Sequence, residues 1–590
     1  MPNAALWSLN VTRRLWRNDQ VLLGTLAVVL GVAAAYGAIA FRTLVSMIQL
    51  AALSTSSEDL LKFMVGLEWW QVVLAPTLGG LTVGLIVHFF TAEQRPLAVA
   101  DVIEAAALRS GRMNLSSGLK AAVVSAISIG SGASVGREGP VVHLGASLAA
   151  FVADKLNLSR GRALTVLGCG VAAAIASSFK APIAGVFFAL EVVVGHYALS
   201  AFAPIVIASV VGTVISRAHY GDFPAFIVAD HLVVSPWEFP IFALLGIACA
   251  GAAFLFMRSI FAMQDIAEKV PGPVWLRPAL AGLVIGLLAL VFPQILGVGY
   301  GVTDQALKGV LGLELLLALI FIKIFATSLC LGFGFGGGVF SPSLVVGAML
   351  GGAFGAAAAL VVPDGLSSPG VYSMVGMGAV AGAVLGAPIS TILIVFELTG
   401  DYKVTIAVMV AVVLASIIVR DVLGRSFFNW QLERRGIDLS GGRENEHLKS
   451  IKVRRVMESR MTTVAAGTKL TDLRRRIIRA PSGVVFVTDK EGRLEGMITM
   501  SDLSEALFDL SLDEFVTAGE MARPPHEFVE AGISLDRAVA AFGEAAKEPF
   551  LPVVQNRRTM KLVGILTERE VMLAQQRALL KARAEEKGEE

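Results

Sequence analysis

The sequence predicts an α-helical polytopic membrane protein with broken helices, followed by a small cytoplasmic α/β domain. Of the 590 residues, 55% are hydrophobic and only 16% are charged, whereas soluble domains carry about 25% charged residues. Apolar segments run almost continuously from Val21 to Val422, and many are interrupted by glycine or proline. Beyond Val422, strand-like runs alternate with polar helical stretches, which is typical of a soluble α/β domain.

The first apolar run, residues 21–50, is too long for the core of a signal peptide. Arg13, Arg14 and Arg17 precede it, and the positive-inside rule then predicts a cytoplasmic N-terminus. Thirteen further apolar segments are candidate membrane helices, and their predicted ranges are 69–90, 119–129, 140–153, 163–178, 182–194, 202–215, 240–261, 276–292, 313–331, 342–361, 371–385, 388–398 and 404–423. Several are shorter than the roughly 20 residues of a straight span, which predicts broken helices that meet at a central binding site.

Two glycine-rich loops, each closed by a proline, open apolar segments: residues 130–140 (GSGASVGREGP) and 332–342 (GFGFGGGVFSP). Proline suits the first turn of a helix. A helix N-terminus has unpaired N–H groups and a partial positive charge, so it attracts anions. We therefore predict a desolvated anion site within the bilayer. Glu138, in the first loop, would compete with that anion.

The chain repeats itself in two places. Residues 140–146 match 342–348 at their proline, glycine and alanine positions, and residues 181–191 match 387–397 with a glutamate at the same distance from the proline. Two matches in the same order indicate an internal duplication, with repeats at about 70–215 and 275–423. The alternative is convergent use of small residues in packed membrane helices.

Arg420, Arg425, Arg434 and Arg435 form a basic border after the last apolar segment, which predicts that the C-terminal part is also cytoplasmic. We expect strands at 483–488 and 494–499, and a second duplication relates 496–502 to 564–570. The predicted organisation is a cytoplasmic N-terminal segment (1–20), a transmembrane domain (21–436), a linker (437–449), two related soluble halves (450–515 and 516–576) and a charged tail (577–590).

Four motifs carry a family resemblance: Gly-Arg-Glu-Gly-Pro at 136–140, Gly-Gly-Val-Phe-Ser-Pro at 337–342, Phe-Lys-Ala-Pro at 179–182, and Phe-Glu-Leu-Thr-Gly-Asp-Tyr at 396–402. They resemble the CLC family of chloride channels and chloride/proton exchangers. The soluble part resembles a tandem pair of cystathionine-β-synthase-type (CBS) domains. The resemblance implies inverted repeats, and a homodimer in the lipid bilayer of a bacterial inner (plasma) membrane. It also implies one anion pathway per subunit, chloride as the bound substrate and no required cofactor.

The resemblance assigns the gating role to Glu138, whose protonation would remove a competitor from the anion site. A plain helix cap is the alternative interpretation. Backbone N–H groups of Val339 and Phe340 would bind the anion. Gly136 and Gly139 would allow close approach of the chain, and Arg137 would add positive potential or pair at the surface.

The sequence departs from the family pattern at three positions. Ala98 occupies the place of a serine that donates to the anion, and Phe428 the place of a tyrosine. Val192 follows Glu191 where exchangers carry a proton-handling glutamate. We therefore expect a channel-like or weakly proton-coupled anion pathway. A proton-coupled chloride antiporter, and a transporter selective for fluoride or nitrate, remain alternatives.

Lys323 is a candidate pathway charge, although a lysine that extends to the membrane surface is an equal alternative. In the soluble pair, Thr499, Asp502, Thr567 and Glu570 resemble positions that hold the ribose and phosphates of an adenine nucleotide (ATP, ADP or AMP). A nucleotide-sensing membrane signalling protein is therefore an alternative of another class.

Other functions find little support in the composition. The net charge of +2 does not suggest a nucleic-acid partner. Cys169, Cys249 and Cys330 lie far apart in apolar segments, and no metal site is expected. Ser134 stands in a Gly-x-Ser-x-Gly pattern, but no histidine is placed to activate it, and we expect no enzyme.

Overall fold

The computed structural model divides the chain into two compact units, residues 1–438 and 439–590. It describes residues 19–55, 66–195, 199–222, 234–362, 365–437, 448, 451–480, 482–503, 515–544 and 548–587. Most of the predicted N-terminal segment (1–20) and most of the predicted linker (437–449) lie outside these residues.

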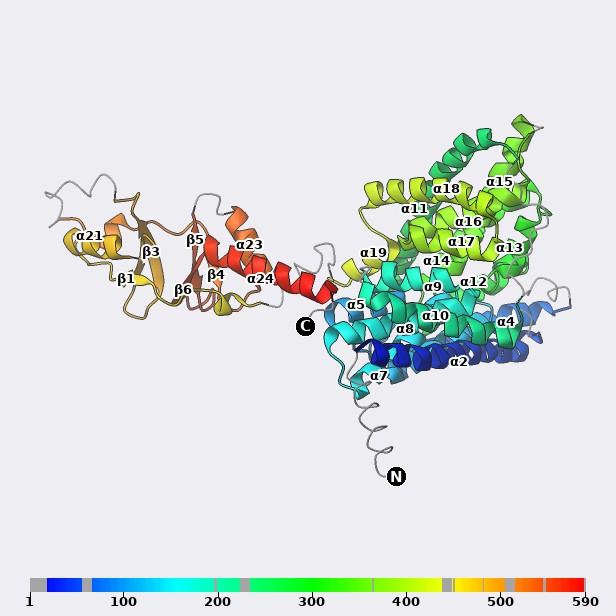
Figure 1. Cartoon of the computed structure of the whole chain (residues 1–590), viewed down its shortest axis with the longest axis horizontal. Coiled ribbons are helices and arrows are strands. Elements are labelled where there is room, and N and C mark those ends of the chain that lie inside the picture. The colour runs from blue at the N-terminus through cyan, green and yellow to red at the C-terminus, as the bar shows by residue number, and fades with distance from the viewer. Residues whose placement is uncertain are drawn as a thin grey trace, which may run out of the picture. The chain divides into compact units, whose positions relative to one another are not determined.

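The first unit is entirely helical in its described part (Figure 1). The helices of its first half are α2 (Asp19–Leu53), α4 (Trp69–Phe90), α5 (Val99–Leu108), α6 (Leu115–Gly130), α7 (Glu138–Lys155), α8 (Arg160–Phe179), α9 (Pro182–Phe188), a π-helical turn at Ala189–Val194, and α10 (Leu199–Tyr220). Those of its second half are α11 (Phe239–Lys269), α12 (Arg277–Ala289), α13 (Tyr300–Leu307), α14 (Leu313–Gly332), α15 (Phe340–Val361), α16 (Pro369–Leu385), α17 (Pro388–Thr399), α18 (Tyr402–Leu423) and α19 (Phe427–Glu433). Short 3₁₀ turns lie at Pro236–Glu238, Val274–Leu276 and Pro293–Ile295.

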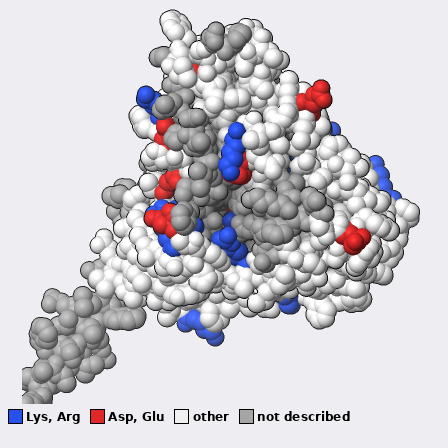
Figure 2. Space-filling model, turned by 90° about the vertical axis from the view of Figure 1, so that its right-hand side faces the viewer, with Lys and Arg blue, Asp and Glu red and all other residues white. Residues whose placement is uncertain are grey.

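Eight of the described helices are long and apolar enough to cross a membrane. Others, including α6, α16 and α17, are apolar but shorter, as expected for broken helices. Large apolar side chains cover the outside of the unit, and Figure 2 shows few and scattered charged residues among the described atoms of one face. A surface of this kind requires lipid as its solvent. The sequence did not predict α5 and α13, because both are short and contain charged residues.

Close contacts between glycines repeat in the two halves. Helices α7 and α8 cross so closely that a Cβ added at Gly170 would lie 2.3 Å from the carbonyl oxygen of Gly145. Helices α15 and α16 cross in the same way, since a Cβ at Gly376 would lie 2.3 Å from the carbonyl oxygen of Gly347. Gly145 and Gly347 are equivalent in the sequence repeat, so the duplication extends to the packing of the helices.

Two glutamates exchange equivalent bonds across the repeats. Glu191 accepts hydrogen bonds from the backbone N–H groups of Ile389 and Ser390 at the start of α17, at 3.1 and 2.8 Å. Glu397, on α17, accepts from Ile183 and Ala184 at the start of α9, at 2.9 and 2.8 Å. Such reciprocal contacts require a local two-fold relation between the halves, which is the arrangement of inverted repeats. Each carboxylate caps a helix N-terminus of the other half.

The second unit contains two three-stranded sheets with the same topology. Its elements are a 3₁₀ turn (Val453–Arg455), β1 (Thr462–Val464), α21 (Leu470–Arg479), β2 (Val484–Thr488), β3 (Leu494–Thr499), α22 (Ala518–Met521), β4 (Val529–Glu530), α23 (Leu535–Glu544), β5 (Phe550–Val554), β6 (Leu562–Thr567) and α24 (Glu568–Lys587). The two expected strands are β2 and β3. In each sheet the central strand pairs with the first strand in parallel and with the last strand antiparallel.

The two sheets also share a detail of their register. The antiparallel pair shifts register between Val487 and Thr488 in the first sheet, and between Val553 and Val554 in the second. Apolar side chains from both sheets, among them Phe486 and Ile565, pack in one common cluster.

The boundary expected at residue 577 falls inside α24, because the charged tail continues this helix without a break through Lys587.

Candidate functional site

The two glycine loops meet in the first unit. Gly136 and Gly338 form an isolated antiparallel bridge, in which the N–H of Gly136 donates to the Gly338 carbonyl at 2.7 Å and the N–H of Gly338 donates back at 2.8 Å. A Cβ at Gly338 would lie 3.0 Å from the Gly139 nitrogen, so the chains approach more closely than side chains would allow. The N-termini of α7 and α15 therefore lie side by side.

The first turns of these two helices supply the candidate anion-binding groups. Helix α7 begins at Glu138 and α15 begins at Phe340, with Arg137 and Val339 as the preceding cap residues. The first N–H groups of a helix have no partner within the helix, and two adjacent N-termini add their positive ends. The Phe340 ring packs 5.0 Å from that of Phe179, so its side chain is part of the core.

Glu138 is buried, with 1% of its surface exposed, between these helix ends. Its Oε1 accepts hydrogen bonds from the Tyr300 hydroxyl at 2.9 Å and from the Ser341 hydroxyl at 2.5 Å. The Arg137 Nε lies 3.9 Å from the same oxygen. Oε2 has no hydrogen-bond partner among the described residues. The carboxylate therefore belongs to the first turn of α7 and is held by a hydroxyl from the first turn of α15.

A cavity of about 470 Å³ leads away from this carboxylate. It is lined by six of the predicted site residues: Ala98, Glu138, Gly139, Val339, Phe340 and Phe428. Cationic side chains line it further along, namely Arg95, Arg277, Arg434 and Arg435. Gly136 and Arg137 are not part of this lining; Gly136 belongs to the loop pair and Arg137 lies against Tyr300.

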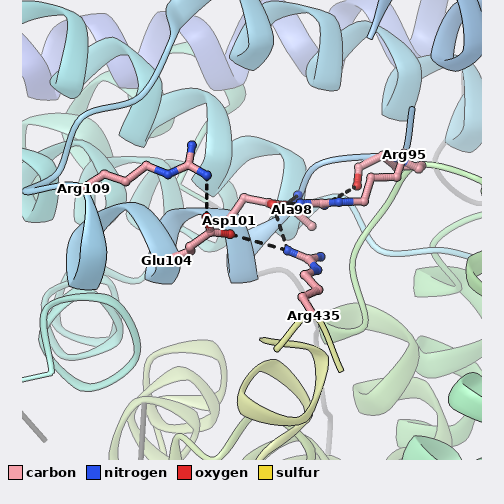
Figure 3. Close-up of polar contacts among 7 residues, drawn as sticks. Arg95, Ala98, Asp101, Glu104, Arg109 and Arg435 are labelled. Atoms are coloured by element: carbon pink, nitrogen blue, oxygen red, sulfur yellow. Dashed lines mark hydrogen bonds and ion pairs between the residues drawn. The ribbon is translucent and has the colours of Figure 1, made fainter. Parts of the chain in front are cut away.

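Ala98 precedes α5 and belongs to a network of charged residues (Figure 3). Asp101 accepts a hydrogen bond from the Ala98 N–H at 2.8 Å, and its carboxylate pairs with Arg95 at 2.6 Å and Arg435 at 2.9 Å. Glu104 pairs with Arg109 at 2.5 Å, and its other carboxylate oxygen lies 4.0 Å from Arg435. The network joins the N-terminus of α5 to the segment after α19, and thereby holds Ala98 and Phe428 on the same cavity.

Lys323 does not line the cavity and does not extend to the membrane surface. It is 1% exposed, and its Nζ donates to the carbonyl oxygens of Ile295 and Gly297 at 2.9 and 3.2 Å. A charge on the anion pathway would face the cavity, whereas the Lys323 Nζ donates to two backbone carbonyl oxygens. The ammonium group instead fixes the loop that leads to Tyr300.

The predicted nucleotide residues form two turns of the same design. Asp502 accepts from the Thr499 backbone and hydroxyl at 2.8 and 2.7 Å, and Glu570 accepts from the Thr567 hydroxyl at 2.8 Å. Arg523 pairs with Asp502 at 3.0 Å and with Glu548 at 2.6 Å. Burial alone would raise the pKa of Asp502, but the hydrogen bonds from Thr499 and Arg523 outweigh burial and lower it. Arg523 is therefore paired with the Asp502 carboxylate, the group that would accept hydrogen bonds from the ribose of a nucleotide.

The sequence patterns did not indicate Tyr300, Ser341 or the Asp101 network as parts of the site. Ser341 directly follows Phe340 within the second motif, and a hydroxyl there could have been noticed. Tyr300 stands between two glycines, at 299 and 301, and such an aromatic residue between membrane helices is a weaker signal. Asp101 stands three residues after Ala98, which is the spacing of a helix-capping carboxylate.

Paired half-helix ends around a buried carboxylate, within an inverted repeat of apolar helices, define an integral multi-pass membrane protein of the broken-helix transport class. Residues 79–420 match the family described as voltage gated chloride channel, and residues 453–509 match the CBS domain. The chain belongs to this voltage-gated chloride channel (CLC) family and carries C-terminal CBS domains.

Two curated relatives each match about two thirds of this chain. A putative chloride channel protein ClcB-like from Ralstonia nicotianae is 32% identical over 65% of this chain and 91% of its own length. The voltage-gated ClC-type chloride channel ClcB of Escherichia coli is 30% identical over 67% of this chain and 95% of its own length. The crystal structure of a eukaryotic CLC transporter has the same fold, with a TM-score of 0.62 at 21% identity over 93% of this chain and 97% of that one.

Proposed function

We propose that the protein transports chloride across the membrane through one pathway per subunit, and that Glu138 gates this pathway. The observation that carries the proposal is the Glu138 carboxylate, which is buried on the paired N-termini of α7 and α15 at the end of the cavity. Chloride and the ionised carboxylate compete for the same positive helix ends. Protonation neutralises Glu138 and releases the site to the anion.

We further propose a channel-like or weakly proton-coupled pathway in a homodimer. Val192 lies in the π-helical turn beside Glu191 and cannot carry a proton, and Glu191 itself is bound to the start of α17. The homodimer would lie in the bacterial inner membrane with both termini in the cytoplasm. Chemical cross-linking of the purified chain tests the dimer, and protease accessibility in oriented vesicles tests the termini.

Reconstitution of the purified chain in liposomes, with chloride and proton movement recorded together, tests the transport function. We expect chloride efflux that responds to pH without a fixed ratio of protons to chloride. Uphill proton movement driven by a chloride gradient would instead establish the antiporter alternative, and vesicles that release fluoride or nitrate but not chloride would establish another substrate. A chain that moves no anion at all would contradict the transport function.

Restoring the missing donors is expected to strengthen chloride binding. Ala98 and Phe428 both line the cavity beside Phe340, so Ala98→Ser and Phe428→Tyr place hydroxyl groups on the anion route. A hydrogen bond to a charged group contributes about 1.5–3 kcal/mol, and each variant should therefore bind chloride at least about ten-fold more tightly. Isothermal titration in detergent measures this, with Phe151→Tyr on the exposed side of α7 as the control. Unchanged affinity in both variants would remove these positions from the site.

An adenine nucleotide at the CBS pair is a second candidate ligand. The paired turns at Thr499–Asp502 and Thr567–Glu570 support it, and the Arg523 pair with Asp502 opposes it at the first turn. Glu570 also lies beside Glu458, and raises the pKa of Glu458 by its hydrogen bond and its charge. Chloride flux with and without ATP separates a regulatory role from a nucleotide-sensing protein whose membrane part only signals, since the latter would show no flux in either condition.

A further inference from the structure

Tyr300 holds the same carboxylate that the proposed gate uses. It is the first residue of α13, and its hydroxyl donates to Glu138 Oε1 at 2.9 Å, next to the bond from Ser341. A hydroxyl that donates to a carboxylate stabilises the ionised form, because the protonated form is a poorer acceptor. The hydroxyl of Tyr300 therefore favours the state in which Glu138 occupies the helix ends.

The ring of Tyr300 is itself held in place. The Arg137 guanidinium lies 4.7 Å from the ring centre, in a cation–π contact. Gly299, the residue before Tyr300, has a φ of 93°, and a Cβ there would lie 2.7 Å from Val345 on α15. Glycine thus lets the start of α13 approach α15, the helix that carries Ser341.

Lys323 fixes the loop that carries Tyr300. Its buried Nζ donates to the carbonyls of Ile295 and Gly297, and the N–H of Gly297 donates to the Gly132 carbonyl at 3.1 Å in the first glycine loop. One helical turn further along α14, the Thr327 hydroxyl lies 3.3 Å from that of Ser134 in the same loop. An ammonium group inside a membrane domain is costly and is retained where it makes specific contacts. Here Lys323 ties α14 to the loop that leads to Tyr300, and Thr327 ties α14 to the loop that leads to Glu138.

We propose that Tyr300 holds the ionised Glu138 on the paired helix ends, and that Lys323 is a positioning residue that keeps the Tyr300 hydroxyl within reach. This inference rests on the proposed gating by Glu138. It adds that two further residues, Tyr300 and Lys323, stabilise the closed state of the pathway. It predicts that the pH at which flux is half-maximal depends on the Tyr300 hydroxyl as well as on Glu138.

Other groups near Glu138 remain unchanged when Tyr300 is replaced. The charged or titratable side chains that line the two cavities next to Glu138 and Tyr300 are Arg42 on α2, His88 on α4, Arg95 before α5, Arg137 before α7, Glu268 on α11, Arg277 on α12, and Arg434 and Arg435 after α19. Asp101, which pairs with Arg95, the buried His143 on α7 and the buried Lys323 on α14 lie outside these two linings. Tyr300→Phe changes none of these charges, and a changed pH response would therefore report the lost hydroxyl.

The test is the pH profile of chloride flux in liposomes for Tyr300→Phe. Loss of one hydrogen bond to the ionised carboxylate is expected to move the pH of half-maximal flux upward by about one unit, which corresponds to about 1.4 kcal/mol. Lys323→Met should shift it in the same direction, and the double variant should shift it no further than Tyr300→Phe alone. Tyr372→Phe is the matched control, because the Tyr372 hydroxyl donates at the same 2.9 Å to a buried carboxylate outside the cavity, that of Glu238. It should leave the profile unchanged.

Two comparisons separate the failure of this inference from the failure of the gate. If Glu138→Gln removes the pH response but Tyr300→Phe and Lys323→Met keep the wild-type midpoint, the roles of Tyr300 and Lys323 are refuted while the gate stands. If Glu138→Gln keeps the pH response, both are refuted. Should Tyr300→Phe not yield folded protein, Lys323→Met serves as the test. It should raise the pH of half-maximal flux in the wild-type background and cause no such shift in the Glu138→Gln background, and an unchanged midpoint in the wild-type background would refute the inference.

Discussion

Replacing Glu138 by glutamine is expected to abolish the pH dependence of chloride flux and to keep the pathway open at neutral pH. The glutamine side chain has nearly the same shape but no charge, so it cannot compete with chloride for the N-termini of α7 and α15. The carboxylate is buried and accepts from two hydroxyls, which would hold it in place until it is protonated. We expect at least ten-fold more flux than wild type at the pH where the wild type is closed, measured as chloride efflux from liposomes.

Glu104→Gln is the control for this variant. Glu104 is also a buried carboxylate, but its ion-pair partners are Arg109, directly after α5, and Arg435. Its replacement should leave the pH response intact. A pH response that persists in Glu138→Gln would mean that the carboxylate is a helix cap, and the gating role would be withdrawn.

A single methyl group at Gly170 is expected to destabilise the membrane unit. The added Cβ would lie 2.3 Å from the Gly145 carbonyl and 2.7 Å from the Ala149 side chain, so α7 would have to move away from α8. Overpacking of this kind costs about 1–3 kcal/mol. Helix α7 begins at Glu138, and the displacement should therefore reduce transport as well as the thermal midpoint of the protein in detergent.

Gly161→Ala is the matched control, since it makes the same substitution on the same helix at a position where a Cβ would meet nothing within 4 Å. Alanine is the better helix former by about 0.5–1 kcal/mol, so this variant should be as stable as the wild type or slightly more stable. Equal thermal midpoints for Gly170→Ala and Gly161→Ala would contradict the close crossing of α7 and α8.

Much of the architecture follows from patterns that are visible in the chain itself. The apolar segments, the repeated proline–glycine and proline–glutamate spacings, and the two turns of the soluble pair correspond to elements of the structure, because each pattern is local. Helices α5 and α13 were not predicted, because they lack a local pattern of this kind. They are short, and the Arg95–Asp101–Arg435 contacts that surround α5 come from residues up to 334 positions apart.

The sequence by itself determined the membrane class and the duplication, since composition, periodicity and repeated spacings are properties of the chain alone. Its motifs also carried the family resemblance, which made Glu138 the candidate gate. Only the tertiary structure decided what touches Glu138. Tyr300 and Ser341 lie 162 and 203 residues away along the chain, and Lys323 turns out to hold a loop instead of lining the cavity. Side chains from distant helices meet at one carboxylate only after the two halves pack, because hydrogen bonds act over a few ångströms and carry no signal along the sequence.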